Sequence, residues 1–196
     1  MNLQSEPKSV AQETPDGGVL HHDEQGRLIR YQHYQEGVLH GETRHYAENG
    51  QLSQRMFYEN GLLHGPFEAF EDGKIALSAS YANGKQDGQT SLYDETGMVK
   101  MRMQYHQGQL EGPCLSYDAT GNVQQIIHYH QNVKHGPSLI YFPSGGVMER
   151  GAYVHGFKEG RFESFYETGA LREVVQFQRG CPVGQPLQYD LKGKQI

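Results

Sequence analysis

The stretch Tyr105–Gln125, YHQGQLEGPCLSYDATGNVQQ, decides the fold because its pattern returns along most of the chain. Each copy starts with an aromatic residue, has a glycine seven residues later, a second aromatic residue five residues further on, and a glycine in the next turn. The starting aromatic recurs every 24 residues, with one spacing of 23, at Tyr34, Tyr58, Tyr81, Tyr105, Tyr129, Tyr153 and Phe177. A period of about 20 to 50 residues is typical of repeat proteins.

The three other columns are filled in all seven units. The first glycine column is Gly41, Gly65, Gly88, Gly112, Gly136, Gly160 and Gly184. The second aromatic column is Tyr46, Phe70, Tyr93, Tyr117, Tyr141, Phe165 and Tyr189, and the closing glycines are Gly50, Gly73, Gly97, Gly121, Gly145, Gly169 and Gly193. A glycine needed in every unit indicates a positive φ or a close backbone approach, so we interpret the first column as structural.

Each unit divides into two strands separated by turns. The first strand follows the column glycine, as in residues 88–93, and acidic, Asn or Thr residues leading to glycine mark a tight turn after it. The second strand alternates, with Val99, Met101, Met103 and Tyr105 on one side. The pattern predicts an all-β fold: an elongated, twisted, single antiparallel β-meander of about seven to eight two-stranded repeats, with about fifteen strands.

The domain organisation follows from where the columns begin. Residues 1–16 are polar, contain two prolines and predict a flexible lead-in. Residues 17–196 form the array, with a degenerate unit at 17–33 and regular units from residue 34. The net charge is −6, and the absence of a long basic run argues against nucleic acid or an anionic membrane as partner. No signal peptide or apolar span is visible, so we expect a cytoplasmic protein.

The candidate binding residues are of two kinds: aromatic residues of the repeat columns, and residues at positions whose identity differs from one unit to the next. We expect one face to carry both aromatic columns with the alternate Leu, Val, Ile and Met, and Arg102 and Arg150 to lie on the opposite face. That apolar face has no helix to cover it, so the sheet must curl over it, pair with a second copy, or offer it to a partner. At its margin we place Arg44, Glu68 and Glu163, which need a charged partner when desolvated, beside the ladder residues Tyr117 and Tyr141.

The eleven histidines do not predict a metal site. His40, His64 and His135 share the column before the first glycine with Asp87, Glu111 and Glu159. Neighbouring units lie about 10 Å apart by strand spacing, whereas zinc ligands must converge within about 2.1 Å of one ion. A polar turn position is therefore favoured over a zinc ladder, and a second cluster of His106, His128 and His130 is a weaker candidate for a functional role.

No catalytic motif, phosphate-binding loop or dinucleotide fingerprint is present, so we predict no enzyme activity, no catalytic or metal site and no cofactor. Cys114 and Cys181 lie in units four and seven, about 30 Å apart by strand spacing. That separation exceeds the reach of a disulfide, so both should be free thiols.

The blocks Tyr58–Gly65 and Tyr81–Gly88, each Tyr-x-Asn-Gly-x-x-x-Gly, resemble the MORN repeat (membrane occupation and recognition nexus). The period of 24 resembles the bacterial variant of this repeat, which occurs in small antitoxin or immunity proteins, and the resemblance covers about residues 17–193. In unit five Asn132 replaces a glycine, which the left-handed tolerance of Asn allows. Residues Tyr93–Gly97 and Tyr117–Gly121 also resemble the YD repeats of Rhs-type toxin shells. Those repeats lack the Tyr-x-x-Gly-x-x-x-Gly block, which this chain has, with Tyr or Phe at its start, in every unit but the fifth.

The resemblance implies a rigid, non-catalytic protein-binding module. We expect an antitoxin or immunity protein that binds and neutralises a cognate toxin or effector enzyme. The alternative is a structural scaffold that organises membrane-proximal or multiprotein complexes. A toxin in a tight 1:1 complex would favour the first function, and binding to liposomes or extended self-assembly would favour the second.

Overall fold

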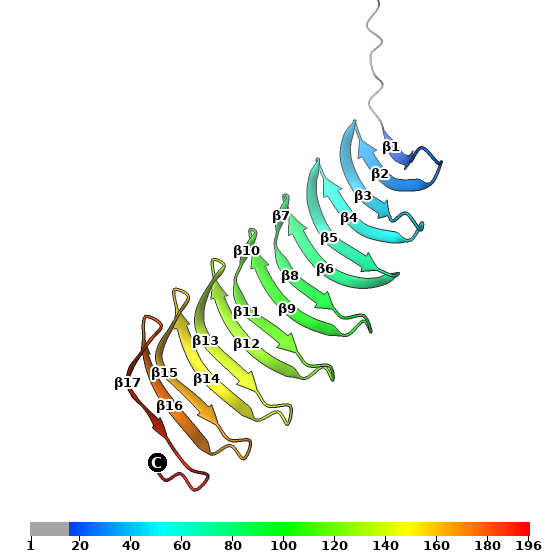
Figure 1. The fold of residues 1–196 in the computed structure, drawn as a ribbon. Coiled ribbons are helices and arrows are strands. Elements are labelled where there is room, and N and C mark those ends of the chain that lie inside the picture. The colour runs from blue at the N-terminus through cyan, green and yellow to red at the C-terminus, as the bar shows by residue number, and fades with distance from the viewer. Residues whose placement is uncertain (1–15) are drawn as a thin grey trace, which may run out of the picture.

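A computed structural model describes residues 16–196 as one open, 17-stranded sheet (Figure 1). All pairings are antiparallel and join strands close in the chain order, and no helix occurs among these residues. The strands are β1 Gly17–His22, β2 Leu28–Gln35, β3 Val38–Tyr46, β4 Leu52–Glu59, β5 Leu62–Glu71, β6 Lys74–Ala82, β7 Lys85–Gln86, β8 Gly88–Tyr93, β9 Val99–His106, β10 Gln109–Leu110, β11 Gly112–Tyr117, β12 Val123–His130, β13 Val133–Tyr141, β14 Val147–Val154, β15 Phe157–Phe165, β16 Leu171–Gln178 and β17 Cys181–Gln188.

The predicted all-β meander is confirmed. β7 and β8 both pair with β6, and β10 and β11 both pair with β9, so each of these two pairs is one interrupted arm. With each interrupted arm taken as one, the sheet has the fifteen arms expected from the repeat. The predicted flexible lead-in, residues 1–16, lies outside the described residues apart from Asp16, and β1 begins at Gly17.

A bulge in the first strand of each unit explains the first glycine column. Tyr58 pairs with Leu63 and Met56 with Phe67, so residues 64–66 lie opposite Phe57 alone. Gly65 adopts a φ of +90° there, and the seven glycines of this column have φ values between +74° and +107°. The predicted positive φ is confirmed: the bulge places two extra residues in the strand, and its glycine takes the left-handed backbone conformation that other residues rarely adopt. In β7–β8 and β10–β11 the same bulge interrupts the strand.

The two-residue turns form the tight-turn edge of the sheet, defined as residues 36–37, 60–61, 83–84, 107–108, 131–132, 155–156 and 179–180. Both central residues of each turn have positive φ, as type I′ hairpins require. Asn132 takes a φ of 67° where the other turns have glycine, which confirms its predicted role. The turns also bond to one another: the second turn residue donates its N–H to a carbonyl one unit earlier, as Gly61 does to Leu39 at 2.8 Å and Asn132 to Leu110 at 3.1 Å.

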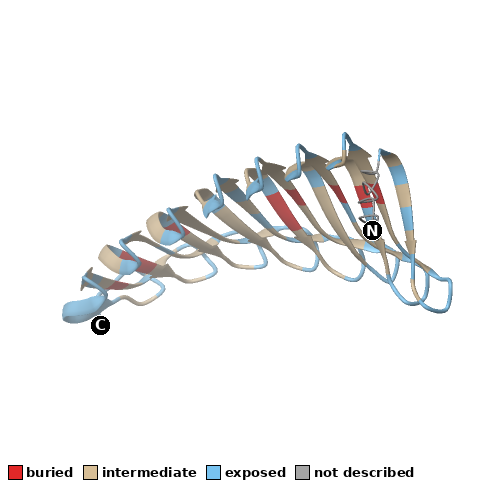
Figure 2. Cartoon of the chain, turned by 90° about the horizontal axis from the view of Figure 1, so that it is seen from above, coloured by how far each residue is buried: buried red, intermediate tan, exposed pale blue. Residues whose placement is uncertain are grey.

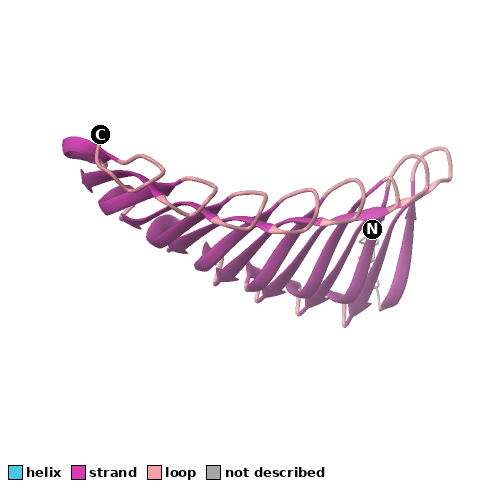
Figure 3. Cartoon of the chain, turned by 90° about the horizontal axis from the view of Figure 1, so that it is seen from below, coloured by secondary structure: helices cyan, strands magenta, loops and turns pink. Residues whose placement is uncertain are grey.

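The opposite ends of the strands are joined by turns that line one edge of the array (Figure 3). These turns are longer, except for the two-residue turn of Asp72 and Gly73 between β5 and β6. In the turn at Asp94 the carboxylate accepts hydrogen bonds from the Thr96 N–H at 2.8 Å and the Met98 N–H at 3.0 Å. Gly97 closes the turn by donating its N–H to the Asp94 carbonyl at 2.9 Å. The side chain of Asp118 repeats this arrangement in the next unit. Aspartate thus fixes these turns locally, as predicted from the Asp-x-x-Gly pattern.

Buried residues lie in the middle of the strands, and within residues 16–196 no second layer covers them (Figure 2). The buried apolar residues are Met56, Ala79, Phe162 and Val174, with exposed fractions of 4 to 9%. Polar residues complete the buried set: Thr43, Thr90 and Ser91 are 1 to 2% exposed, and Gln32, Ser138 and Glu163 are 6 to 9% exposed. A single sheet can bury only the residues that its own neighbouring side chains cover, so the core is one row wide on each face.

The last strand, β17, has an exposed outer edge that is unsuited to further pairing. The Tyr189 N–H points toward β16 and donates to the Arg172 carbonyl at 2.9 Å. Because the direction of the backbone N–H alternates along a strand, the backbone nitrogen of residue 186 points away from β16, toward the open edge. Pro186 has no N–H to offer there. Pro182 occupies the outward position beside the closing pair of the hairpin, Gln178 and Cys181. Two prolines therefore block the edge where another strand would add.

Candidate protein-binding faces

The two aromatic columns lie on opposite faces of the sheet, which corrects the expectation of one shared face. Gly41 pairs with Tyr58 and Thr43 with Met56, so these four residues share a face. Tyr46 stands three residues after Thr43 in the same strand and points the other way. We call the side of Met56, Met103 and the starting aromatics the methionine face. The side of Arg44, Arg55, Arg102, Arg150 and the second aromatic column is the arginine face.

A continuous row of cross-strand neighbours runs along the middle of the arginine face. Direct pairing joins Arg44 to Arg55, Arg55 to Glu68, Arg102 to Leu115, and Arg150 to Glu163. The five predicted binding residues Arg44, Glu68, Tyr117, Tyr141 and Glu163 therefore all lie on this face. Arg102 and Arg150, which we expected on the opposite face, lie in the same row. The bulges cause the error, because they shift the pairing without changing the alternation within a strand.

The predicted charged residues are already paired within the protein. Arg44 binds Glu42, Glu68 accepts from Arg55 Nε at 2.8 Å, and Glu163 binds both Arg150 and, at 2.7 Å, Arg161 Nη2. The hydrogen bond to Glu42 raises the pKa of the Arg44 guanidinium above its ordinary value. The protein itself therefore supplies the charged partners that these residues were expected to need. Their pairing holds the guanidinium groups in fixed positions on an open face.

Arginine side chains also lie against aromatic rings of this face, among them Tyr117 and Phe165 of the second aromatic column. Arg44 lies 5.6 Å from the Tyr31 ring centre, Arg102 5.7 Å from that of Tyr117, and Arg150 5.2 Å from that of Phe165. Arg102 differs from the others, since within residues 16–196 it has no carboxylate within ion-pair distance. The contact with the Tyr117 ring face is a cation–π interaction, which stabilises this charge.

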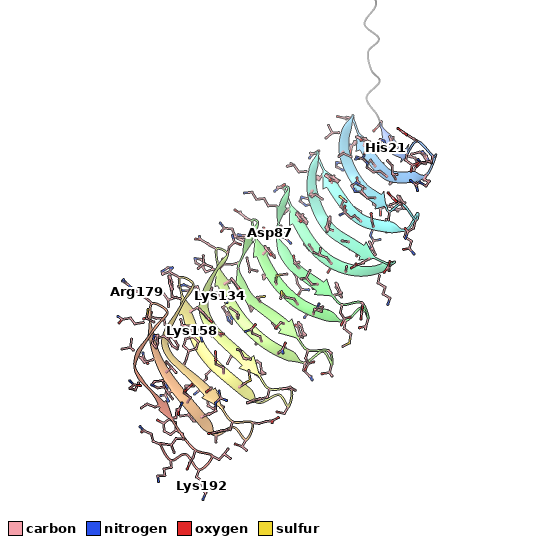
Figure 4. The ribbon with its side chains drawn as sticks, in the orientation of Figure 1. His21, Asp87, Lys134, Lys158, Arg179 and Lys192 are labelled. Carbon is pink, nitrogen blue, oxygen red and sulfur yellow. The ribbon has the colours of Figure 1, made fainter. Side chains whose placement is uncertain are left out.

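The methionine face is the more closely packed of the two. Phe162 contacts Tyr153 and Phe177 edge to face, with ring centres 5.9 and 5.1 Å apart. The Lys158 ammonium lies 4.4 Å from the Phe162 ring centre, and Lys134 lies 5.2 Å from that of Tyr153 (Figure 4). Burial raises the pKa of Tyr153 and of the Cys114 thiol. The aromatic rings of the methionine face thus pack against other side chains of the protein. The arginine face is therefore the better candidate for contact with a partner.

The column before the first glycine has a structural role that sequence reasoning only partly foresaw. The Asp87, Glu111 and Glu159 carboxylates accept hydrogen bonds from the Gln107, Gln131 and Arg179 N–H groups, at 3.1, 3.0 and 2.8 Å. These donors are the first residues of the next tight turns, so each carboxylate ties one repeat to the following one along the tight-turn edge (Figure 4). The predicted polar turn position is therefore an inter-repeat clamp.

Histidines along this edge interact with the clamps and with one another. Glu111 also bonds to His130 Nδ1 at 2.8 Å, and this bond is the main cause of the lowered pKa of Glu111. The His135 ring lies 6.0 Å from that of His130 and 5.3 Å from that of His155. His128 points instead to the Pro137 carbonyl, 3.0 Å away. No group of three or more His, Cys, Asp or Glu in the described part of the chain could hold a metal ion.

Sequence reasoning missed Arg55, Arg161 and Glu42 as members of the arginine face. A signal was available, because Arg55 precedes Glu68 by 13 residues and Arg150 precedes Glu163 by the same 13. A repeated offset of opposite charges across one turn indicates cross-strand ion pairs. Cys114 and Cys181 are free, as predicted. Residues 16–196 contain no helix that could cross a membrane.

Comparisons with known proteins agree with the repeat. The family model described as MORN repeat variant matches residues 39–61, 110–131 and 158–179. No curated protein matches the chain. A crystal structure of a mutant of S. aureus TarM in complex with Fondaparinux, alpha-GlcNAc-glycerol and UDP is similar at 12% identity and a TM-score of 0.28. The match covers 61% of this chain but 19% of that one, and a likeness at that score says nothing about this chain's function.

Proposed function

Three repeats of this chain are MORN repeat variants, and from that premise we propose that it is an antitoxin or immunity protein that binds and neutralises a cognate toxin. MORN-variant repeats are generally non-catalytic protein-binding modules. The finer proposal, a toxin partner in the cytoplasm, follows from the resemblance of the 24-residue period to small bacterial antitoxin and immunity proteins.

The observation that carries the proposal is the arginine face. All five predicted binding residues lie on it. It carries five arginines and three glutamates in a chain whose net charge is −6: Arg44, Arg55, Arg102, Arg150, Arg161, Glu42, Glu68 and Glu163. Arg and Tyr are enriched at the energetic centres of protein interfaces. The arginine and tyrosine side chains of this face are held on hydrogen-bonded strands. The protein therefore loses little conformational entropy when a partner docks on them. Binding of this kind blocks an enzyme by covering its active site.

The test is affinity capture of partners from the native host with the tagged, full-length protein. We expect one dominant protein in a 1:1 complex, and we expect its toxicity in a growth assay to be relieved when this chain is co-expressed. Arg102→Glu should weaken capture, whereas Lys192→Glu, which makes the same charge change in a longer turn (Figure 4), should not. Liposome binding or extended oligomers without a protein partner would support a scaffold and contradict the proposal.

A further inference from the structure

The middle of the arginine face combines an apolar row with positive charge at both ends. From Arg102 the cross-strand row continues through Leu115, Ile126 and Leu139 to Arg150, over β9, β11, β12, β13 and β14. The three aliphatic residues are half-buried, although nothing but their own neighbours covers them. Four strand spacings of about 4.8 Å separate the two arginines by about 19 Å. We call these five residues the bracketed row.

Neither end of the bracketed row is neutralised. Arg102 lies over Tyr117 and has no carboxylate partner in the described chain. At the other end Arg150 and Arg161 share the single carboxylate of Glu163, whose side chain is 11% exposed while theirs are 56 and 58% exposed. Two guanidinium groups in ion-pair contact with one carboxylate leave one positive charge on this cluster. A shallow depression at that end is lined by Leu139, Arg150, Arg161, Glu159 and Glu163 among others, and the Glu159 carboxylate accepts a hydrogen bond from the Arg179 N–H at 2.8 Å.

From this arrangement we infer the chemistry of the partner: the bracketed row binds a protein segment with two carboxylates about 19 Å apart and apolar side chains between them. This inference rests on the proposed protein-binding function and adds the class of segment recognised. Two carboxylates at that distance are about six residues apart in an extended segment, or about thirteen in a helix. The aliphatic residues provide contact area, and the arginines fix the register and favour acidic segments over others.

The packing of the other face supports this choice of site. The charged groups over the rings of the methionine face, Lys134 and Lys158, lie against Tyr153, Phe162 and Phe177, and Lys158 is also within 3.7 Å of a Glu149 carboxylate oxygen. No comparable apolar row with an arginine at each end occurs on that face among residues 16–196. Charge complementarity therefore points to an acidic segment on the arginine face.

The experiment selects binders to the full-length protein from a displayed library of random 16-residue peptides, which spans both conformations. The selected peptides are then synthesised and titrated at low and high salt. We expect enrichment of sequences with two acidic positions six or thirteen residues apart and apolar residues between. Arg102→Glu/Arg161→Glu should weaken their binding by about tenfold or more at low salt, and less at high salt. The matched control Lys134→Glu/Lys192→Glu changes the net charge equally and should leave affinity unchanged.

A charge exchange separates recognition from a folding defect. Peptides in which the two acids are replaced by lysine should bind Arg102→Glu/Arg161→Glu more tightly than the unsubstituted protein. Enrichment of peptides without acids, equal weakening by both double variants, or failure of the charge exchange would overturn the inference while leaving a protein-binding function in place. A protein partner captured from the host without an acidic segment would also overturn it. Conversely, if acidic peptides bind as expected but no toxin is captured, the toxin proposal fails and the inference stands.

Discussion

Phe162→Ala tests whether the methionine face is the packed face of this single-layered sheet. Phe162 is 4% exposed and makes two edge-to-face ring contacts, to Tyr153 and Phe177. Truncating a buried Phe costs about 3–5 kcal/mol. On an open sheet the neighbours can partly close the gap, so we expect about 3 kcal/mol. The control is Phe157→Ala, because Phe157 is 57% exposed and should lose about 1 kcal/mol or less.

The assay is urea unfolding followed by far-ultraviolet circular dichroism, with amide hydrogen exchange of β14 to β17 as a local readout. With a urea m value of about 2–3 kcal/mol per molar, a loss of 3 kcal/mol lowers the midpoint by about 1–1.5 M. Since each repeat contacts only its neighbours, faster exchange should concentrate in β14 to β17 and spare β1 to β6. Equal midpoints for the two variants, or the larger loss in Phe157→Ala, would refute the assignment of the faces.

The remaining predictions concern the backbone, the turns, the clamps and the shape. Gly112 has a φ of +81° and no atom within 4 Å of an added Cβ, so Gly112→Val should cost about 1–3 kcal/mol of unfolding free energy through backbone strain alone, and more than Gly112→Asn or Lys100→Val. Hydrogen bonds, first that from the Thr96 hydroxyl, hold the pKa of Asp94 below its ordinary 3.8, so its contribution to stability should be present above pH 3.8 and lost as the pH falls through the folded value; carboxyl titration by nuclear magnetic resonance checks this, and an unshifted pKa contradicts it. Glu111→Gln should speed amide exchange at Gln131, whose N–H the carboxylate accepts, and unchanged exchange would exclude the clamp. Small-angle scattering should give a radius of gyration well above the roughly 16 Å of a compact chain of this length.

The repeat columns were enough to predict the strands, the turns and the positive φ of the first glycine column. These features depend on local backbone geometry. Gly65 sets the geometry of its bulge, and Asp94 sets that of its turn. The number of arms was also predictable, because a meander adds two arms per period. The four repeat columns therefore carried most of the information about the fold.

The distribution of residues between the faces could not be read from the same columns. A face is defined by pairing across strands, and each unit contains bulges that shift this pairing by a residue or more, as at Phe57 and between His45 and Tyr46. The alternation of Thr43 and Tyr46 within one strand does place them on opposite faces, but assigning Arg150 and Glu163 to one face required the register. For the same reason, the ion-pair partners of Arg44 and Glu68 could not be predicted without the register.

The bonds from turn to turn along the tight-turn edge have a mechanical consequence. The ends of the array lie far apart and the strands run across its length (Figure 1). A pulling force applied between those ends is therefore directed along the inter-strand hydrogen bonds, which break one after another rather than all at once. The Gly61–Leu39 type of bond and the carboxylate clamps join neighbouring hairpins, so an arm cannot peel away until its turn has been released. Under tension the protein should lengthen in steps of one hairpin, with the resistance set at the turns.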